Sequence, residues 1–250
     1  MDQEVVAVAI LLVAAFVPSL VYLVWIRNTE RYGREPYGRL LRIFIFGAVV
    51  SIAISLVFEL ILVSALNLGI GRLYEILGEH QGLGELILVC VIAPIVEEMA
   101  KGLGVVRHRR FLRELEDGLV FGAAAGLGFA ATENLLYESA TYFSGPVTSF
   151  ITLTIIRSLS SAVLHAGASS FMGLGVARSA LQGRSWVPYY FGAVLMHSLF
   201  NFAASFGVLF ESDFGTPAYL VGLVAAFLIA IAGISMARRK IRSLESGGAS

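Results

Sequence analysis

Long apolar stretches alternate with short polar ones along nearly the whole chain. A helix that crosses the hydrocarbon core of a membrane needs about 20 mainly apolar residues. Seven stretches reach that length, at about 4–26, 40–64, 85–106, 118–137, 148–177, 187–209 and 217–237. The pattern therefore predicts an all-α, polytopic integral membrane protein with about seven transmembrane helices, which together form a single domain over residues 1–238.

Two segments fall outside these spans. Residues 67–84, between the second and third spans, are too polar to cross a membrane and fit an amphipathic extracytoplasmic segment. Residues 239–250 are expected to form a cytoplasmic tail. The first span is expected to remain as a membrane anchor, because Asp2 and Glu4 replace the basic start of a signal peptide.

The composition agrees with this class. Hydrophobic residues make up 57% of the chain and charged residues 14%, against about 25% charged residues in soluble domains. The mean hydropathy is +0.81. Eighteen basic and eighteen acidic residues cancel, so no net charge favours a nucleic-acid partner. We therefore expect the cell membrane as location and the lipid bilayer as partner.

The basic residues predict the orientation in the membrane. Fifteen of the eighteen Lys and Arg lie in the first, third and fifth loops and the C-terminal tail, whereas Arg72 alone lies on the other side. Cytoplasmic loops carry an excess of Lys and Arg. The N-terminus is therefore expected outside and the C-terminus in the cytoplasm.

Five charged residues lie near the middle of the predicted spans, and Glu59 also lies inside one; the five are Glu97, Glu98, Lys101, Glu133 and Arg157. On insertion scales an ionised side chain at the centre of a bilayer costs about 2.5–3.5 kcal/mol. Five of them facing lipid would cost as much as a domain's whole folding stability. We expect these side chains to face one another or water held inside the helical bundle.

The third span places a carboxylate and an amine on one helix face. Glu97 and Lys101 are four residues apart, so they can form an ion pair, whereas Glu98 points about 100° away. Pro94 lies four residues before Glu98 and favours a kink, because it removes a backbone hydrogen bond. A kinked helix can open a hydrated pocket beside the carboxylates.

The next three spans carry further polar groups. In the fourth span three glycines repeat every four residues: Gly118, Gly122 and Gly126. This spacing lets membrane helices approach closely. Glu133 shares that face, and Asn134 and Tyr137 follow it. The fifth span has a polar stripe at steps of four residues: Arg157, Ser161, His165 and Ser169. The sixth carries His197 and Asn201.

These residue types suit hydrolysis inside a membrane. A glutamate in a low-dielectric pocket can act as a general base toward water, and His or Asn can stabilise an oxyanion. In this hypothesis Glu97, Glu98, His165, His197 and Asn201 are catalytic, and no cofactor is needed. The alternative is a zinc site with His165, His197 and Glu98 as ligands.

The ordered set of motifs resembles the PrsW family of intramembrane proteases, which belongs to a superfamily with the type II CAAX prenyl proteases. The resemblance spans about residues 90–205 and rests on Glu97-Glu98-x-x-Lys101, Asp117-Gly118, Glu133-Asn134-x-x-Tyr137, Arg157 with His165, and His197-x-x-x-Asn201. It implies an intramembrane endopeptidase that hydrolyses membrane protein substrates, with a role in regulated proteolysis. It also implies supporting roles for Lys101, Glu133, Asn134, Tyr137 and Arg157.

The sequence departs from the CAAX-protease pattern, because Lys101 stands where an arginine one residue later is expected. Glu133-Asn134 also replaces a Phe-x-x-x-His motif, so cleavage of prenylated peptides is the less expected activity. Two other functions fit the same residues. One is a non-catalytic membrane scaffold or chaperone on this fold. The other is a proton-coupled transporter, which the absence of an evident internal repeat disfavours.

Overall fold

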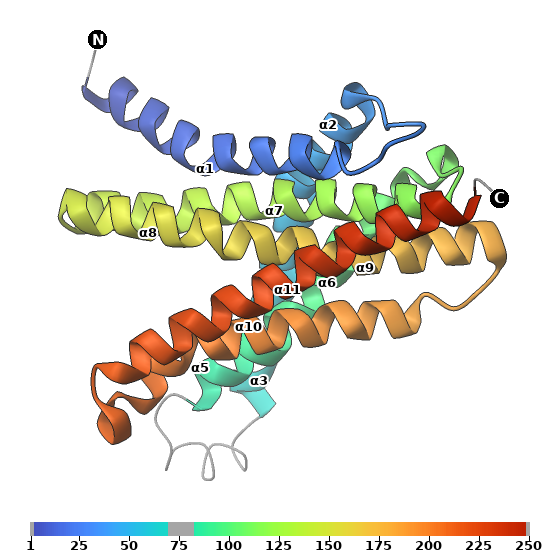
Figure 1. Ribbon diagram of the computed structural model, residues 1–250. Coiled ribbons are helices and arrows are strands. Elements are labelled where there is room, and N and C mark those ends of the chain that lie inside the picture. Colours follow the sequence, from blue (N-terminus) through green and yellow to red (C-terminus); the bar gives the residue numbers. More distant parts are fainter. Residues whose placement is uncertain (1–2, 70–82, 249–250) are drawn as a thin grey trace.

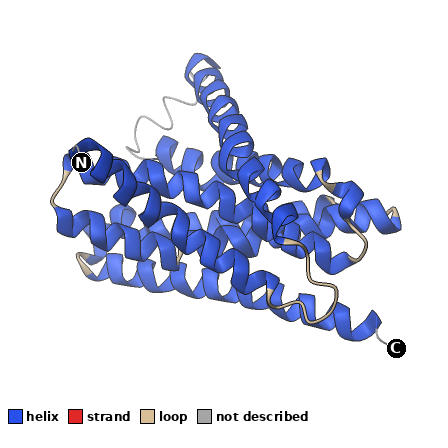
Figure 2. Ribbon diagram, turned by 90° about the horizontal axis from the view of Figure 1, so that it is seen from above, coloured by secondary structure: helices blue, strands red, loops and turns tan. Residues whose placement is uncertain are grey.

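The computed structural model describes residues 3–69 and 83–248, which are mostly helical, with short loops and no strand among them (Figures 1 and 2). In chain order they are α1 (Gln3–Arg27), α2 (Tyr37–Ile45), η1 (Phe46–Ser51), α3 (Ile52–Gly69), α5 (Leu83–Ile87), η2 (Leu88–Ile92), α6 (Ala93–Arg107), η3 (Arg109–Phe111), α7 (Leu115–Ser144), α8 (Val147–Leu159), α9 (Ser161–Gln182), α10 (Val187–Phe214) and α11 (Pro217–Gly248). The predicted all-α fold is confirmed.

Within the described residues, six helical segments are long and apolar enough to cross a membrane: Glu4–Arg27, Tyr37–Ser64, Leu115–Ser144, Val147–Gln182, Val187–Phe214 and Pro217–Ser246. The seventh expected span, 85–106, is helical as α5, η2 and α6. It is not among the six, and three charged residues, Glu97, Glu98 and Lys101, lie close together in it. These charges need protein partners.

Three other segments are compared with their expected boundaries. The stretch 148–177 consists of two helices, α8 and α9, which are separated at Ser160. Helix α11 continues to Gly248, so most of the expected tail 239–250 is helical. Most of the expected amphipathic segment 67–84 lies outside the described residues.

Helix α7 is the centre of the bundle, and its small residues bring α9 into backbone contact. A Cβ atom added at Gly122 would lie 2.0 Å from the Ser169 carbonyl oxygen, and one at Gly126 would lie 2.3 Å from the His165 carbonyl oxygen. Only glycine fits at such distances. The glycine repeat therefore sets the distance at which His165 stands from α7.

The opposite face of α7 packs as closely against the second span. A Cβ atom at Gly128 would lie 1.9 Å from the carbonyl oxygen of Phe44 in α2. The hydroxyl of Thr132 donates a hydrogen bond of 2.7 Å to the carbonyl oxygen of Ala48, in the π-helical turn η1. Helix α7 is thus in close backbone contact on both faces.

Replacing Gly126 with alanine is expected to push α9 away from α7. Overpacking of this kind costs about 1–3 kcal/mol, so Gly126→Ala should lower the thermal stability of the protein in detergent. Gly192→Ala on α10 is the matched control, because no atom lies within 4 Å of its added Cβ. Equal unfolding temperatures for the two variants would contradict the packing role.

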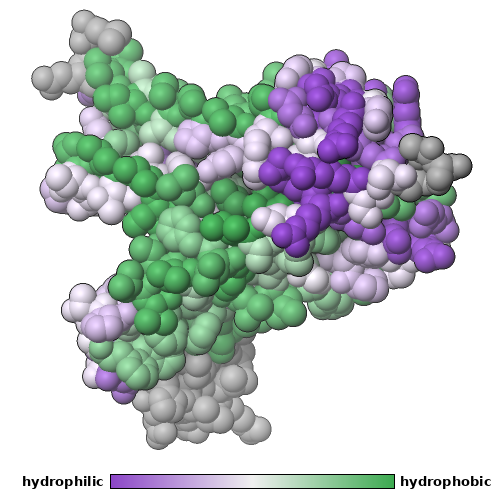
Figure 3. All heavy atoms as spheres, in the orientation of Figure 1, coloured by the Kyte–Doolittle hydropathy of each residue, from purple (hydrophilic) through white to green (hydrophobic). Residues whose placement is uncertain are grey.

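Hydrophilic residues gather at one end of the molecule, where the 28–36 loop and the end of α11 lie (Figure 3). The Glu245 carboxylate accepts hydrogen bonds from the backbone N–H groups of Arg31 (2.6 Å) and Tyr32 (3.1 Å). The first loop is thereby tied to the end of α11. These two basic segments share one side of the bundle, and the assignment of that side to the cytoplasm stays a prediction.

Glu30 in this loop is expected to make stability depend on pH. Burial, together with the nearby carboxylates of Asp117, Glu35 and Glu245, raises the pKa of Glu30 from 4.5 to about 8. The folded protein therefore keeps this proton where the unfolded chain loses it. The resulting stability is complete below about pH 4.5 and falls as the pH rises through 8.

Thermal unfolding measured from pH 5 to pH 9 checks this expectation. Glu30→Gln removes the titrating group, so the decline toward high pH should be smaller than in the wild type. Glu4→Gln, at an exposed position on α1, should leave the decline unchanged. An equally steep decline in Glu30→Gln would assign it to other groups.

Candidate active site

The helix that carries the paired glutamates is not a regular α-helix. Residues Leu88–Ile92 form a π-helical turn, and Pro94 follows at the start of α6. Proline cannot donate a backbone hydrogen bond and clashes with the carbonyl four residues earlier, which a widened turn relieves. The Asn201 amide donates a hydrogen bond of 2.8 Å to the carbonyl oxygen of Val89 in this turn. Asn201 thus fastens α10 to the irregular turn.

Lys101 is the central cation of the site. Its side chain is completely buried. The ammonium lies 3.0 Å from Glu97 Oε2, 2.9 Å from Glu98 Oε1 and 2.7 Å from His165 Nδ1. It also stands 4.1 Å from the centre of the Phe129 ring. One lysine therefore serves both glutamates and reaches across to α9.

Glu98 is completely buried among side chains of three helices. Its carboxylate accepts a hydrogen bond of 2.8 Å from the Ser169 hydroxyl and lies 3.0 Å from His197 Nδ1. Because Nδ1 of His197 faces this carboxylate, Nε2 of the ring faces Glu97, at 3.8 Å from Oε2. A carboxylate behind a histidine fixes the tautomer and the ring orientation.

Glu133 holds the other histidine in the same way. Its Oε2 lies 2.9 Å from His165 Nε2 and accepts a hydrogen bond of 2.9 Å from Arg157 Nη2. Arg157 also donates to Asn134 Oδ1 at 2.8 Å and lies over the Tyr137 ring at 4.1 Å. His165 is therefore held between Glu133 on one ring nitrogen and Lys101 on the other.

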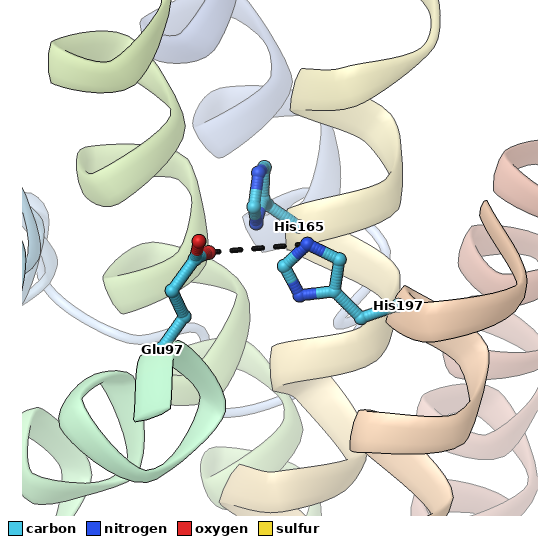
Figure 4. A group of neighbouring side chains, drawn as sticks. All are labelled: Glu97, His165 and His197. Atoms are coloured by element: carbon cyan, nitrogen blue, oxygen red, sulfur yellow. Dashed lines mark ion pairs between the residues drawn. The ribbon is translucent and has the colours of Figure 1, made fainter. Parts of the chain in front are cut away.

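Glu97, His165 and His197 meet at one point (Figure 4). One ligand atom from each lies within 4.8 Å of the others, and all three residues are buried. Glu97 and His165 also line a cavity of about 590 Å³, which extends between α3, α7, α8 and α10. Two imidazoles and a carboxylate form a donor set that suits zinc, with room for water as a further ligand.

The structure brings together most of the residues named from the sequence. Glu97, Glu98, Lys101, His165 and His197 are in direct contact. Three supporting residues, Glu133, Asn134 and Arg157, form the adjoining network, with Tyr137 under Arg157. The carboxylate grouped with both histidines is Glu97, whereas the sequence-based zinc set had Glu98. Asn201 lines the cavity, but its amide is bonded to Val89.

Two contacts of the site were not predicted as such. Ser169 was noted only as part of a polar stripe, and Phe129 was not singled out. Ser169 lies four residues beyond His165, and that spacing is the signal that places its hydroxyl on the same face. Phe129 lies four residues before Glu133, one helical turn away on α7.

Removing the central cation is expected to destabilise the protein strongly. Lys101→Met leaves Glu97 and Glu98 buried without their ammonium, and breaking a buried ion pair costs about 3–5 kcal/mol. Chemical denaturation in detergent should show this loss. Lys240→Met, at a half-exposed lysine on α11, is the control. Unchanged stability in Lys101→Met would mean that other groups neutralise the carboxylates.

The fold and the site together define a multi-pass helical membrane protein with a buried glutamate–histidine centre of the kind that supports hydrolysis. The family described as PrsW family intramembrane metalloprotease matches residues 35–232. The chain belongs to this family, which confirms the resemblance found in its motifs. It is accordingly a membrane protease, and the cell membrane is its location.

Three relatives, each named Protease PrsW, support this assignment. The protein of Clostridioides difficile (strain 630) is 30% identical over 203 residues, which cover 77% of this chain and 78% of the relative. That of Halalkalibacterium halodurans is 26% identical over 199 residues, 76% of this chain and 81% of the relative. That of Bacillus subtilis (strain 168) is 30% identical over 128 residues, which cover 50% of this chain and 51% of the relative. No solved structure matches the chain.

Proposed function

We propose that this protein cleaves membrane protein substrates inside the bilayer by hydrolysis at the Glu97–His165–His197 centre, with a role in regulated proteolysis. One observation carries the proposal: a cavity of about 590 Å³ within the helical bundle has Glu97 and His165 on its wall. The family match favours a protease over the scaffold and transporter alternatives.

Glu97 is the residue proposed to take a proton from the attacking water. It faces the cavity, whereas Glu98 is 0% exposed and is occupied by Lys101, Ser169 and His197. Lys101 holds one Glu97 oxygen at 3.0 Å, so the carboxylate has a fixed position. A positioned base contributes about 10²- to 10⁴-fold to the rate of a hydrolysis.

His165 is proposed to face the scissile bond beside Glu97. Both its ring nitrogens are fixed, by Lys101 and by the Glu133–Arg157 pair, so the ring meets the substrate in one orientation. His197 is held by Glu98 with its Nε2 toward Glu97. Glu98, Lys101 and Glu133 then act as positioning residues, because each contacts Glu97, His165 or His197, and Arg157 acts through Glu133.

Zinc fits the same centre, with Glu97, His165 and His197 as its ligands. When bound, it would polarise the scissile carbonyl and lower the pKa of the attacking water. Three carboxylates against two cations leave a net charge of −1 in the network, which favours a further cation. The Lys101 ammonium contacts two of the three ligands, so it competes with the metal for them.

Cleavage of a panel of single-span membrane proteins by the purified protein in liposomes tests the proposal. Glu97→Gln should abolish cleavage while the protein still folds, because Lys101 keeps Glu98 as its partner. Glu98→Gln should lower both activity and stability, because it disturbs Lys101 and His197 together. Glu4→Gln, at an exposed position on α1, is the control for a change of carboxylate that leaves the centre intact.

Wild-type cleavage by folded Glu97→Gln would contradict the proposed mechanism.

The same assay is repeated with a metal chelator to test for zinc. Activity lost on chelation and restored by Zn²⁺ would assign Glu97, His165 and His197 as ligands. Activity that survives chelation would assign direct activation of water to Glu97.

A further inference from the structure

The α7–α8 hairpin contains buried polar groups that neither the packing nor the catalytic centre accounts for. Five side-chain atoms there have no hydrogen-bond partner among the described residues: Asn134 Nδ2, both carboxyl oxygens of Glu138, Thr154 Oγ1 and Ser158 Oγ. Glu138 is 0% exposed. Buried polar groups in proteins are nearly always paired, with protein or with ordered water.

The register of the two helices brings these atoms into one cluster. The rings of Tyr142 and Phe150 are 5.3 Å apart, and Arg157 Nε bonds to Asn134 Oδ1 at 2.8 Å. The two helices are antiparallel: from Tyr142 back to Asn134 is eight residues on α7, and from Phe150 forward to Arg157 is seven residues on α8. By this register Glu138 lies opposite Thr154, whose hydroxyl group is near enough to interact with its carboxyl group, and Asn134 lies opposite Arg157, the residue before Ser158.

The amide of Asn134 has a defined orientation at this cluster. Arg157 Nε can only donate, so the atom that faces it at 2.8 Å is the amide oxygen. The Asn134 Nδ2 donor is then left for the cluster, beside carboxyl oxygens and two hydroxyl groups. Sodium would need acceptors only, whereas a water molecule donates twice and accepts twice. The mixture of donors and acceptors therefore fits water.

We propose that Asn134, Glu138, Thr154 and Ser158 form an internal water-binding site, and that its water molecules fix Asn134 and thereby position Arg157 in the catalytic network. The second half of this statement rests on the proposed function. Water buried between polar groups typically makes two to four hydrogen bonds. Two such molecules provide enough hydrogen bonds for all five atoms, in a region where bulk water and lipid offer none.

The route from this site to the catalytic centre is a chain of short contacts. Asn134 Oδ1 accepts from Arg157 Nε at 2.8 Å, and Arg157 Nη2 donates to Glu133 Oε2 at 2.9 Å. The same Glu133 oxygen lies 2.9 Å from His165 Nε2. A change at Glu138 therefore reaches His165 through Asn134, Arg157 and Glu133, and the last two of these also line the cavity. It should alter kcat and its pH profile.

A cryo-EM map of the protein in lipid nanodiscs, at a resolution that shows ordered water, tests the site itself. We expect density between α7 and α8 within hydrogen-bond distance of Glu138 and Asn134 Nδ2. A dry interface would overturn the proposal. So would an unfolding temperature that rises with sodium but not with potassium, because the density would then be a cation. Neither measurement depends on protease activity.

Variants test the positioning role. Glu138→Leu and the double change Thr154→Val, Ser158→Ala remove partners of the water. Loss of groups behind a catalytic residue typically costs about 10- to 100-fold, and we expect that loss in kcat. Glu138→Gln keeps polar atoms in place and should retain most of the activity. Thr152→Val, at an exposed position on α8, is the matched control.

Wild-type kcat and pH profile in folded Glu138→Leu would refute the positioning role. If Glu138→Leu does not fold, the hydroxyl double variant decides the question in the same assay. If the wild-type protein cleaves no substrate, the proposed function is contradicted. Density for water in the map would establish the water site in that case as well.

Discussion

A single buried ammonium holds the centre of this protein together. Lys101 is completely buried, and such a charge is stable within a membrane only when acceptors surround it. Its three acceptors come from two helices: Glu97 and Glu98 on α6 and His165 on α9. The same cation therefore balances the two carboxylates and fixes the separation of α6 and α9. Without the Lys101 ammonium, both buried carboxylates would lack a compensating positive charge on α6.

This ion cluster depends on how closely α9 approaches α7. The carbonyl oxygens of Ser169 and His165 lie where a Cβ of Gly122 or Gly126 would stand. A larger residue at either glycine would move α9 outward, and the His165 ring would lose its 2.9 Å contact with Glu133. The buried ion cluster therefore depends on close backbone packing, because the polar side chains of α7 and α9 can reach one another only when the two helices are nearly in contact.

Much of this arrangement follows from patterns that the sequence carries locally. Apolar runs predicted the membrane-spanning helices, and the i to i+4 spacing predicted the Glu97–Lys101 pair that the structure contains. The spacing from Gly126 to Glu133 placed that carboxylate on the inward face of α7. The break at Ser160 had no such signal, because neither glycine nor proline marks it. The remaining features of the site are contacts between helices. Helical periodicity predicts which residues share a face of a helix, but it does not predict which other helix packs against that face.

The different environments of Glu97 and Glu98 show why the partners of a site need the whole fold. Adjacent residues on a helix point about 100° apart, so only one of them can face the cavity. Which one does so depends on the rotation of α6, and that rotation follows the π-helical turn before Pro94. The turn is in turn tied to α10, because Asn201 bonds to the Val89 carbonyl. The Asn201 amide, which the sequence placed at the reaction centre, thus lines the cavity and also holds the irregular turn, from which Glu97 enters the cavity.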